Sequence, residues 1–224
     1  MTDTQKYLQA TQSIDSDNPR IIELAAGICG DTDDVHEKAR RLFMYVRDEI
    51  KYTVYAPMYP ESQYKATTII ERGLGYCVQK AVVLCALARA AGIPARLVFA
   101  DIVNYAVSET LIEMMGSNLF TYHSYSEMFL GDKWVQMTPA FDKGLSEEHG
   151  FPLVEFDGYQ DAIFAPTDAR GNKFVEYIKH YGVFADIPFG PMLQSWEDNY
   201  GKERLDLWKK ASVMGSMSGS KGGI

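Results

Sequence analysis

Apolar residues recur every three or four positions between residues 35 and 50, and this spacing predicts a helix with one buried face. The positions that share the face are Val35, Ala39, Leu42, Phe43, Val46 and Ile50. The mostly acidic residues 31–34 come directly before them and suit the positive end of a helix dipole. An earlier, mostly apolar run, 21–29, predicts another helix, because Pro19 favours a helix start and Gly30 a helix end.

Residues 77–92 predict a helix of a different kind, apolar nearly all round and therefore buried. It begins at Cys77, and Gly92 followed by a proline gives it a C-terminal cap and a stop. Ahead of it, residues 52–64 contain two prolines and predict a surface loop, whereas residues 66–73 predict one or two helical turns.

Strand-like segments follow this helix. Residues 96–103 predict one β-strand, and residues 104–118 predict an irregular insertion or a short helix. Residues 121–130 and 133–140 predict two further strands. They are separated by Gly131-Asp132, a typical two-residue turn between antiparallel strands, so the sequence predicts a hairpin here.

Glycine, proline and aspartate recur at short intervals after Phe141 and predict an irregular segment that wraps the core. Residues 174–182 and 191–212 are each predicted to form a short helix. We expect a single domain over residues 1–211. The remaining residues, 212–224, are rich in glycine and serine and predict a flexible tail.

Composition is ordinary for a globular protein of 224 residues, with 46% hydrophobic and 23% charged residues. The formal net charge of -8 argues against nucleic acid as the main partner, because phosphate binding needs a basic face. The N-terminal residues lack the apolar core of a signal peptide, and no run of about eighteen apolar residues predicts a membrane span. We therefore expect a cytoplasmic protein without a nucleic-acid or membrane partner.

The chain has three cysteines, an odd number without a CxxC pair, which disfavours a zinc knuckle or a disulfide framework. Cys77 and Cys85 would lie about 12 Å apart along a helix axis, too far for a disulfide. We interpret Cys85 and Cys29 as core residues. No cluster of metal-ligating residues is evident, and we expect no cofactor.

Cys77 is the candidate nucleophile. It falls in the first turn of the buried helix, where unpaired N–H groups and the helix dipole favour a thiolate and lower a cysteine pKa. Gly73 and Gly75 precede it; they permit a tight turn and the approach of a substrate. The alternative is a structural cysteine that packs as a small apolar group.

His123 is the candidate base. In a strand it shares one face with Tyr125, Glu127 and Phe129, inside an apolar hairpin. The alternative is a core histidine whose ring nitrogens are satisfied by neighbours. The other three histidines have surroundings that predict solvated surface side chains: His36, His149 and His180.

A third residue could orient the far nitrogen of His123. If the two-residue turn forms, residue 138 is a diagonal neighbour of His123 on the same face. The residue there is Thr138 rather than an acid. Asp142 is the third catalytic residue that we expect, since it can curl back past Pro139, and Asp101 is another option.

Three segments, in this order, resemble the transglutaminase-like superfamily, a relative of the papain-like cysteine peptidases. ARRLFMYVRDEIKYTV resembles its entry helix, GLGYCVQKAVVLCALARAAGIPARLV its nucleophile helix and next strand, and HSYSEMFLGDKWVQMTP its histidine hairpin. The resemblance covers roughly residues 35–142, so that residues 143–211 form a C-terminal extension. It implies an α+β fold of N-terminal helices and a buried nucleophile helix packed on an antiparallel β-sheet. It also implies Cys77 as nucleophile and His123 as base, with Thr138 where the family usually has its acid.

The function implied by this resemblance is acyl transfer on an amide bond through a Cys77 thioester. Backbone N–H groups at the start of the helix would hold the oxyanion, and Tyr76 is either a further donor or a packing aromatic. With water as acceptor the protein is a cysteine peptidase or amidase, which we favour by analogy with small bacterial members; with an amine it is transglutaminase-like. The partner is then a peptide, protein or small amide substrate.

The alternative function is a catalytically degenerate domain that serves as a binding or scaffold protein. The sequence predicts no oligomeric state. The extension also carries aromatic and acidic residues that either cover the cleft and set specificity or pack at an edge: Phe156, Asp157, Tyr159 and Asp161.

Overall fold

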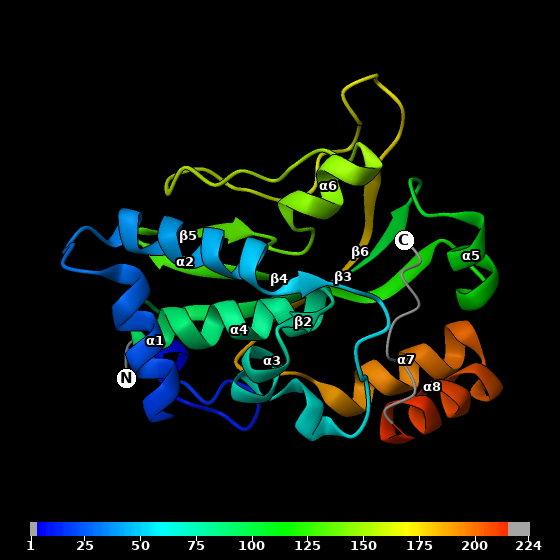
Figure 1. The fold of residues 1–224 in the computed structure, drawn as a ribbon, viewed down its shortest axis with the longest axis horizontal. Helices are drawn as coiled ribbons and strands as arrows, with labels where there is room; N and C mark the ends of the chain where they lie inside the picture. Colours follow the sequence, from blue (N-terminus) through cyan, green and yellow to red (C-terminus); the bar gives the residue numbers. More distant parts are fainter. Residues whose placement is uncertain (1–3, 215–224) are drawn as a thin grey trace.

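A four-stranded antiparallel sheet and one buried helix form the centre of the molecule (Figure 1). The computed structural model describes residues 4–214. The strand order is β5-β4-β3-β6, and helix α4 (Cys77–Ala90) packs against β3 (Ala95–Asn104) and β4 (Leu119–Leu130). The predicted arrangement, a buried helix on an antiparallel sheet, is confirmed.

Three N-terminal helices contact α4 on the side away from the sheet: α1 (Pro19–Cys29), α2 (Val35–Glu49) and α3 (Ala66–Arg72). The side chains of Asn18 and Asp34 cap α1 and α2 by accepting backbone N–H groups of the first turn. These helices match the predicted ones. Two short 3-10 helices complete this part of the chain, η1 (Gln5–Leu8) and η2 (Glu61–Tyr64).

Helix α4 is buried along its length, as predicted from its composition: every residue from Val78 to Arg89 is buried. Its single lysine, Lys80, donates from Nζ to the backbone carbonyl oxygens of Arg47 and Ile50 at the end of α2. Burial lowers the pKa of Lys80 to about 7. These bonds fix the end of α4 that carries Cys77 against the end of α2.

The predicted hairpin is present. Strands β4 and β5 (Lys133–Met137) pair from Leu130↔Lys133 to Ser126↔Met137, which is the register that a two-residue turn requires. Strand β5 ends at Met137 rather than at residue 140. The residues of β4 before Ser126 therefore have no pairing partner in β5. The backbone N–H of Thr138 donates instead to the carbonyl of Ala162.

Residues 174–182 do not form the helix that we expected. They belong to strand β6 (Val175–Phe184), which pairs antiparallel with β3 from Leu97↔Phe184 to Asn104↔Val175. The segment is rich in aromatic and β-branched residues, which favour strands. The partner strand lies more than seventy residues earlier in the chain, so the choice between helix and strand is made by tertiary pairing.

The second C-terminal helix that we expected is two helices. α7 (Phe189–Tyr200) and α8 (Lys202–Met214) are separated by Gly201, whose φ of +89° suits glycine and ends a regular helix. α8 continues three residues past the expected start of the tail at 212, and residues 215–224 lie outside the described part. The other helices are α5 (Glu109–Met115) and α6 (Lys143–His149).

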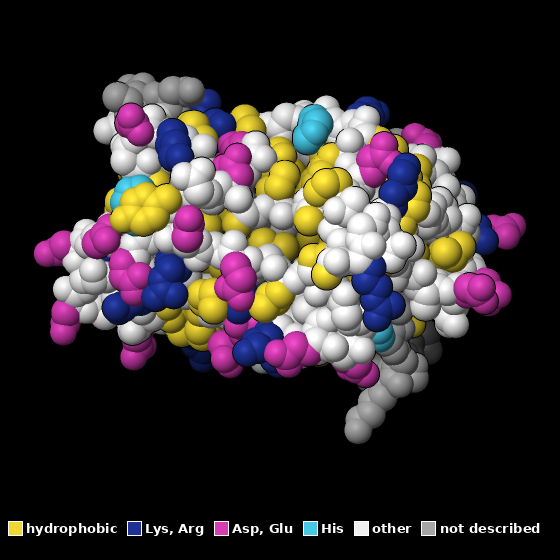
Figure 2. Space-filling model, turned by 90° about the horizontal axis from the view of Figure 1, so that it is seen from above, with side chains coloured by type: hydrophobic (Ala, Val, Ile, Leu, Met, Phe, Trp, Pro, Cys, Tyr) yellow, Lys and Arg dark blue, Asp and Glu magenta, His cyan; other side chains and the backbone are white. Residues whose placement is uncertain are grey.

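No helix within residues 4–214 combines the length and the apolar character that crossing a bilayer demands. On the face seen in Figure 2, acidic and basic side chains are interspersed around a middle region where hydrophobic side chains gather. This face therefore offers no continuous basic surface of the kind that phosphate groups attract.

Candidate active site

Cys77 is the first residue of α4, and three backbone N–H groups act to lower the pKa of its thiol. Two of them, of Cys77 and Val78, belong to the first turn of the helix. The third belongs to Ser124, the residue after His123, on the part of β4 that β5 leaves unpaired. The structure therefore brings the predicted nucleophile and the predicted base to adjacent positions, although they lie 46 residues apart in the sequence.

The pKa of Cys77 does not move in the direction that we expected from a helix N-terminus. Burial raises the pKa of the thiol to about 11, although the backbone N–H groups of Ser124, Val78 and Cys77 act to lower it. The loss of hydration raises the pKa of Cys77 more than the helix N-terminus lowers it, because aromatic side chains surround the sulfur. In this resting state Cys77 is a neutral thiol.

The turn before Cys77 is built by a small parallel pair, β1 (Lys51–Tyr52) and β2 (Leu74–Gly75). It places Tyr52 beside the start of α4. A Cβ at Gly75 would lie 3.0 Å from Cβ of Gln79, so glycine is needed here for close packing. Oε1 of Gln79 in turn accepts the N–H of Tyr76 at 3.4 Å, which fixes the residue directly before the thiol.

Tyr76 packs as an aromatic rather than offering a free hydroxyl. Its hydroxyl is hydrogen-bonded to the hydroxyl of Tyr64, and the two rings meet edge to face with their centroids 6.1 Å apart. Of the two interpretations drawn from the sequence, the packing one fits this contact.

His123 lies in β4 and is 3% exposed. Its ring has aromatic neighbours, with centroids 5.5 Å from Phe164 and 6.0 Å from Tyr177. Burial lowers the pKa of the imidazole to about 3, so the ring is neutral at physiological pH. Its Nε2 atom is buried without a hydrogen-bond partner, and one side of the residue lines the same cavity as Cys77.

The expected third residue, Asp142, lies at the N-terminus of α6 and is bonded elsewhere. Its carboxylate accepts the N–H of Leu145 at 3.2 Å, which caps the helix, and the N–H of Tyr52 at 2.9 Å. It also lies 3.8 Å from Nζ of Lys51. These contacts do not reach His123, and the catalytic role of Asp142 stays a prediction that its hydrogen bonds do not support.

The two other options for the third position differ in kind. Asp101 accepts the backbone N–H of Tyr122 at 3.0 Å and the hydroxyl of Tyr181 at 2.9 Å, so it acts on the chain next to His123 rather than on its ring. Thr138 is buried, and its Oγ1, like Nε2 of His123, has no hydrogen-bond partner. The place where an acid would sit is therefore occupied by an unpaired hydroxyl.

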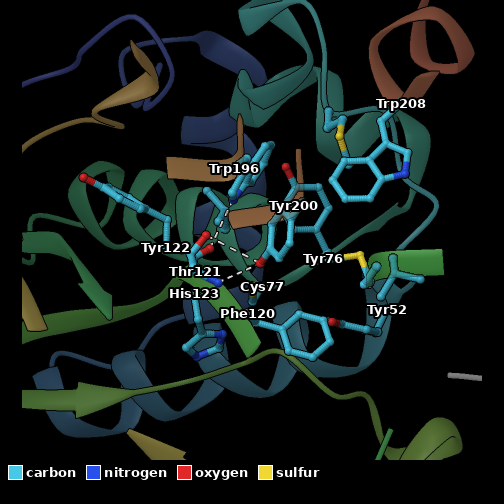
Figure 3. Close-up of a pocket in the computed structure, with 14 residues that line it drawn as sticks. Tyr52, Tyr76, Cys77, Phe120, Thr121, Tyr122, His123, Trp196, Tyr200 and Trp208 are labelled. Atoms are coloured by element: carbon cyan, nitrogen blue, oxygen red, sulfur yellow. Dashed lines mark hydrogen bonds between the residues drawn. The ribbon is translucent and has the colours of Figure 1, made fainter. Parts of the chain in front are cut away.

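A cavity of about 70 Å³ opens beside Cys77 and His123 (Figure 3). Aromatic residues dominate its wall: Tyr52, Tyr76, Phe120, Tyr122, Trp196, Tyr200 and Trp208. Val54, Met58, Val78, Met115 and Thr121 supply the rest of the lining. Among the residues that the structure describes, the lining holds no aspartate, glutamate, lysine or arginine.

Helices α7 and α8 supply three of these aromatic residues, and α7 is tied to the start of β4. Nε1 of Trp196 donates to the carbonyl of Thr121 at 3.1 Å. The Tyr200 hydroxyl accepts the N–H of Thr121 at 2.8 Å and donates to the carbonyl of Leu119 at 3.1 Å. Trp208 of α8 contacts Tyr200 edge to face. The C-terminal helices thus close the cavity on one side.

The residues that we considered as a cover for the cleft lie away from this cavity. Phe156 is buried against Phe43, and Tyr159 stacks on His36 with ring centroids 4.2 Å apart. The carboxylate of Asp157 accepts backbone N–H groups of its own loop, and that of Asp161 accepts the backbone N–H of Gln136 in β5. Of the two interpretations, edge packing is the one that the contacts fit.

Two of the three remaining histidines are less exposed than we expected. Nδ1 of His36 lies 2.7 Å from the carbonyl oxygen of Gly158, under the ring of Tyr159. His149 ends α6, stacks on Phe151 and has a buried, unpaired Nε2. His180 is exposed, but on β6 rather than near a helix end. All three lie outside the lining of the Cys77 cavity.

Cys29 and Cys85 are buried in the core, as predicted, and neither lines the cavity. The sequence analysis did not identify the cavity residues that α7 and α8 supply. Trp196 and Tyr200 are spaced as neighbours on one helix face. That spacing signals an aromatic face but gives no sign of what the face covers.

The comparison with protein families matches residues 22–139, more than half of the chain, to the model described as "Transglutaminase-like superfamily". The matched region includes Cys77, His123 and Thr138, and it ends before α6. No curated protein matches the sequence.

Among solved structures, one similar chain is described as a "Putative Cysteine Protease" from Cytophaga hutchinsonii. It has a TM-score of 0.52 and 19% identity, and the match covers 83% of this chain and 48% of that one. Another is described as a "putative protease" from Parabacteroides distasonis, with a TM-score of 0.37, 15% identity, and 59% and 24% coverage. This chain thus spans about half the length of the Cytophaga protein.

Proposed function

The chain belongs to the transglutaminase-like superfamily, and from this premise we propose that it is a thiol-dependent acyl-transfer enzyme that acts on an amide bond through a Cys77 thioester. The supporting observation is that Cys77, at the start of α4, and His123, in β4, line one cavity. The backbone N–H of Ser124, the residue after His123, also acts to lower the pKa of the Cys77 thiol. The described fold neighbour from Cytophaga, a "Putative Cysteine Protease", agrees with a thiol mechanism.

In the first half of the reaction, neutral His123 removes the proton from Cys77 Sγ, and the thiolate attacks the carbonyl carbon of the substrate amide. The C–N bond breaks when the tetrahedral intermediate collapses. The imidazolium returns the proton to the departing nitrogen, and the acyl group remains on Sγ as a thioester. The backbone N–H groups at the start of α4 are the donors for the oxyanion, because the first N–H groups of a helix have no partner within it.

In the second half, His123 removes a proton from the acceptor, whose oxygen or nitrogen attacks the thioester carbonyl. The C–S bond breaks, and the imidazolium proton returns to the thiolate. We favour water as the acceptor, which makes the protein a peptidase or amidase. An amine acceptor would make it transglutaminase-like.

The neutral resting state has a consequence for this mechanism. A thiol with a pKa of about 11 and an imidazole with a pKa of about 3 do not form a stable ion pair before substrate binds. Proton transfer from Cys77 to His123 must therefore accompany the attack on the carbonyl, when the developing charge on sulfur is consumed by the new bond.

A second candidate function is suggested by Thr138, which stands where an acid would be expected to orient His123. Nε2 of His123 and Oγ1 of Thr138 are both buried without partners, and no acid of residues 4–214 is hydrogen-bonded to the ring. An imidazolium at His123 would lack the carboxylate that usually stabilises it. The competing proposal is therefore a domain that binds a peptide or protein in the cavity without turning it over.

Ammonia release from glutaminyl peptides, with and without a primary amine, compares the two acyl-transfer reactions directly. Wild-type protein is expected to release ammonia or cleave the peptide, and Cys77→Ala is expected to abolish this. Cys29→Ala, which changes a buried cysteine outside the cavity, is the matched control. Peptide binding without any turnover by wild-type protein would favour the binding domain.

A further inference from the structure

The cavity beside Cys77 has the chemistry of an apolar subsite. Rings and thioether side chains form its wall, and the charged residues of the described chain are absent from it. A carboxylate or an ammonium group placed there would lose its water without gaining an opposite charge, which is strongly unfavourable. The wall therefore discriminates against ionised groups.

Three of the aromatic wall residues already use their polar ends within the protein. The Tyr76 hydroxyl is bonded to Tyr64, and the Tyr200 hydroxyl is bonded to Thr121 and Leu119. Nε1 of Trp196 donates to a backbone carbonyl. These bonds hold the three rings in place and leave their apolar surface to line the cavity (Figure 3).

Size and position restrict the occupant further. At about 70 Å³ the cavity suits a single side chain rather than a folded segment. It lies directly beside Sγ of Cys77, which is bonded to the acyl half of a substrate after the first step. The group that reaches the cavity is then the side chain next to the scissile carbonyl, because only one or two bonds separate it from the thioester.

We propose that this cavity binds a neutral apolar side chain, aliphatic or aromatic, next to the scissile carbonyl on the acyl half of the substrate, an assignment that rests on the proposed acyl-transfer function. Trp196, Tyr200 and Trp208 come from α7 and α8, outside residues 22–139 that match the family. The C-terminal helices thus complete an apolar wall whose other residues come from the region that matches the family.

Fluorogenic amides of acetyl-leucine, acetyl-phenylalanine, acetyl-glutamate and acetyl-lysine test the assignment, with kcat/KM as the measured quantity. The leucine and phenylalanine amides are expected to exceed the two charged ones by at least about tenfold, the scale of discrimination that an apolar pocket gives. Equal or better turnover of glutamate or lysine would overturn the subsite while leaving the acyl-transfer function intact.

Chloromethyl ketones of the same four acetyl amino acids separate the subsite from turnover, since alkylation of Cys77 needs no acyl acceptor. If no amide is cleaved but the leucine and phenylalanine reagents label Cys77 at least about tenfold faster than the charged reagents, the subsite stands and the enzymatic proposal fails. Labelling without selectivity would overturn the subsite.

Two substitutions in the cavity wall test the same subsite assignment. Trp208→Ala is expected to reduce the preference for leucine over glutamate at least threefold. Leu207→Ala, on the same helix but 63% exposed, should leave it unchanged. Because removal of a buried tryptophan also disturbs packing, Met115→Lys is the second variant. It places a cation in the lining and should shift the preference toward the glutamate reagent, a gain that unfolding cannot mimic.

Discussion

The carboxylate of Asp101 accepts a hydrogen bond from the backbone N–H of Tyr122, the residue directly before His123. Tyr122 has a φ of +54°, in the left-handed region that L side chains rarely adopt, and among residues 4–214 no other non-glycine residue does so. The Tyr181 hydroxyl donates to the second carboxylate oxygen, and its ring stacks on Tyr122 with centroids 4.1 Å apart.

This conformation explains how four consecutive residues of β4, from Phe120 to His123, can all line one cavity. A regular strand alternates its side chains between two faces. The ladder between β3 and β4 shifts register between Ala100 and Ile102, so that two residues of β4, Thr121 and Tyr122, lie opposite the single residue Asp101 of β3, as in a β-bulge. Asp101 therefore sets the position of His123 through the backbone.

Asp101→Ala is expected to slow the alkylation of Cys77 and to lower the free energy of unfolding by about 1–3 kcal/mol, because the left-handed backbone loses its acceptor. In a Tyr122→Gly background the same Asp101→Ala substitution should cost less, since glycine adopts positive φ without strain and no longer needs the acceptor to hold it. Chemical denaturation and iodoacetamide kinetics measure both effects. An equal cost of Asp101→Ala in the two backgrounds would contradict the role assigned to Asp101.

The rate at which iodoacetamide alkylates Cys77 should rise with pH. Burial raises the pKa of this thiol to about 11, so between pH 7 and pH 10 the thiolate fraction grows about tenfold per unit. The imidazole, with its pKa lowered to about 3, adds no inflection near neutrality. Peptide mapping at each pH gives the rate for Cys77 alone. A plateau already reached at pH 6 would show a thiolate–imidazolium pair instead of the neutral resting state.

His123 should make the fold sensitive to acid. Its pKa is about 3 in the folded chain and about 6.5 in an unfolded one, so the unfolded state binds more protons between these values. The stability that neutral His123 provides is complete above pH 6.5 and is lost as pH falls toward 3. His123→Gln should therefore lose less stability than wild-type protein between pH 6.5 and pH 4. Equal slopes in thermal melting at several pH values would rule this out.

Asp142 can be tested as a cap and as a catalytic residue in one comparison. Asp142→Ala removes the acceptor for Leu145 and Tyr52 and is expected to lower the free energy of unfolding by about 1–2 kcal/mol. Asp142→Ser keeps a helix-capping oxygen and should recover part of that loss. If Asp142 is only structural, both variants keep wild-type alkylation rates at Cys77. Loss of reactivity in a stable Asp142→Ser protein would instead establish the catalytic role predicted from the sequence.

The elements that the sequence predicts well are those decided by local pattern. The face from Val35 to Ile50 and the apolar composition of 77–92 fix two helices without reference to any partner, and Gly131-Asp132 fixes the hairpin register. The sequence pattern does not predict strand β6, because the pairing of β6 with β3 is a long-range contact. It predicts one helix where α7 and α8 are two, because a single glycine, Gly201, divides them.

The residues of the candidate site also differ in whether a local sequence pattern predicts them. Cys77 and His123 stand out because each belongs to a motif with its own local signal. The left-handed backbone of Tyr122 has no such signal, since tyrosine gives no hint of positive φ. The aromatic wall of α7 and α8 is likewise invisible in the sequence, because only the packing of α7 on β4 shows what the rings cover.

Replacing Thr138 by aspartate should improve the reactivity of the His123–Cys77 pair. Thr138 follows the last paired residue of β5, and the hairpin register continued by one residue would set it diagonal to His123. Oγ1 of Thr138 and Nε2 of His123 are both buried without hydrogen-bond partners. A carboxylate in that place would stabilise the imidazolium, raise the pKa of His123 and favour proton transfer from Cys77. We expect Thr138→Asp to increase Cys77 alkylation at pH 7 by about tenfold, the effect of one pKa unit.

Thr138→Asn is the matched control for this substitution, because it has the same shape but no charge and should give little increase. A folded Thr138→Asp protein without any gain at pH 7 would mean that residue 138 does not reach the ring of His123. Circular dichroism of both variants establishes that the fold is retained before the rates are compared.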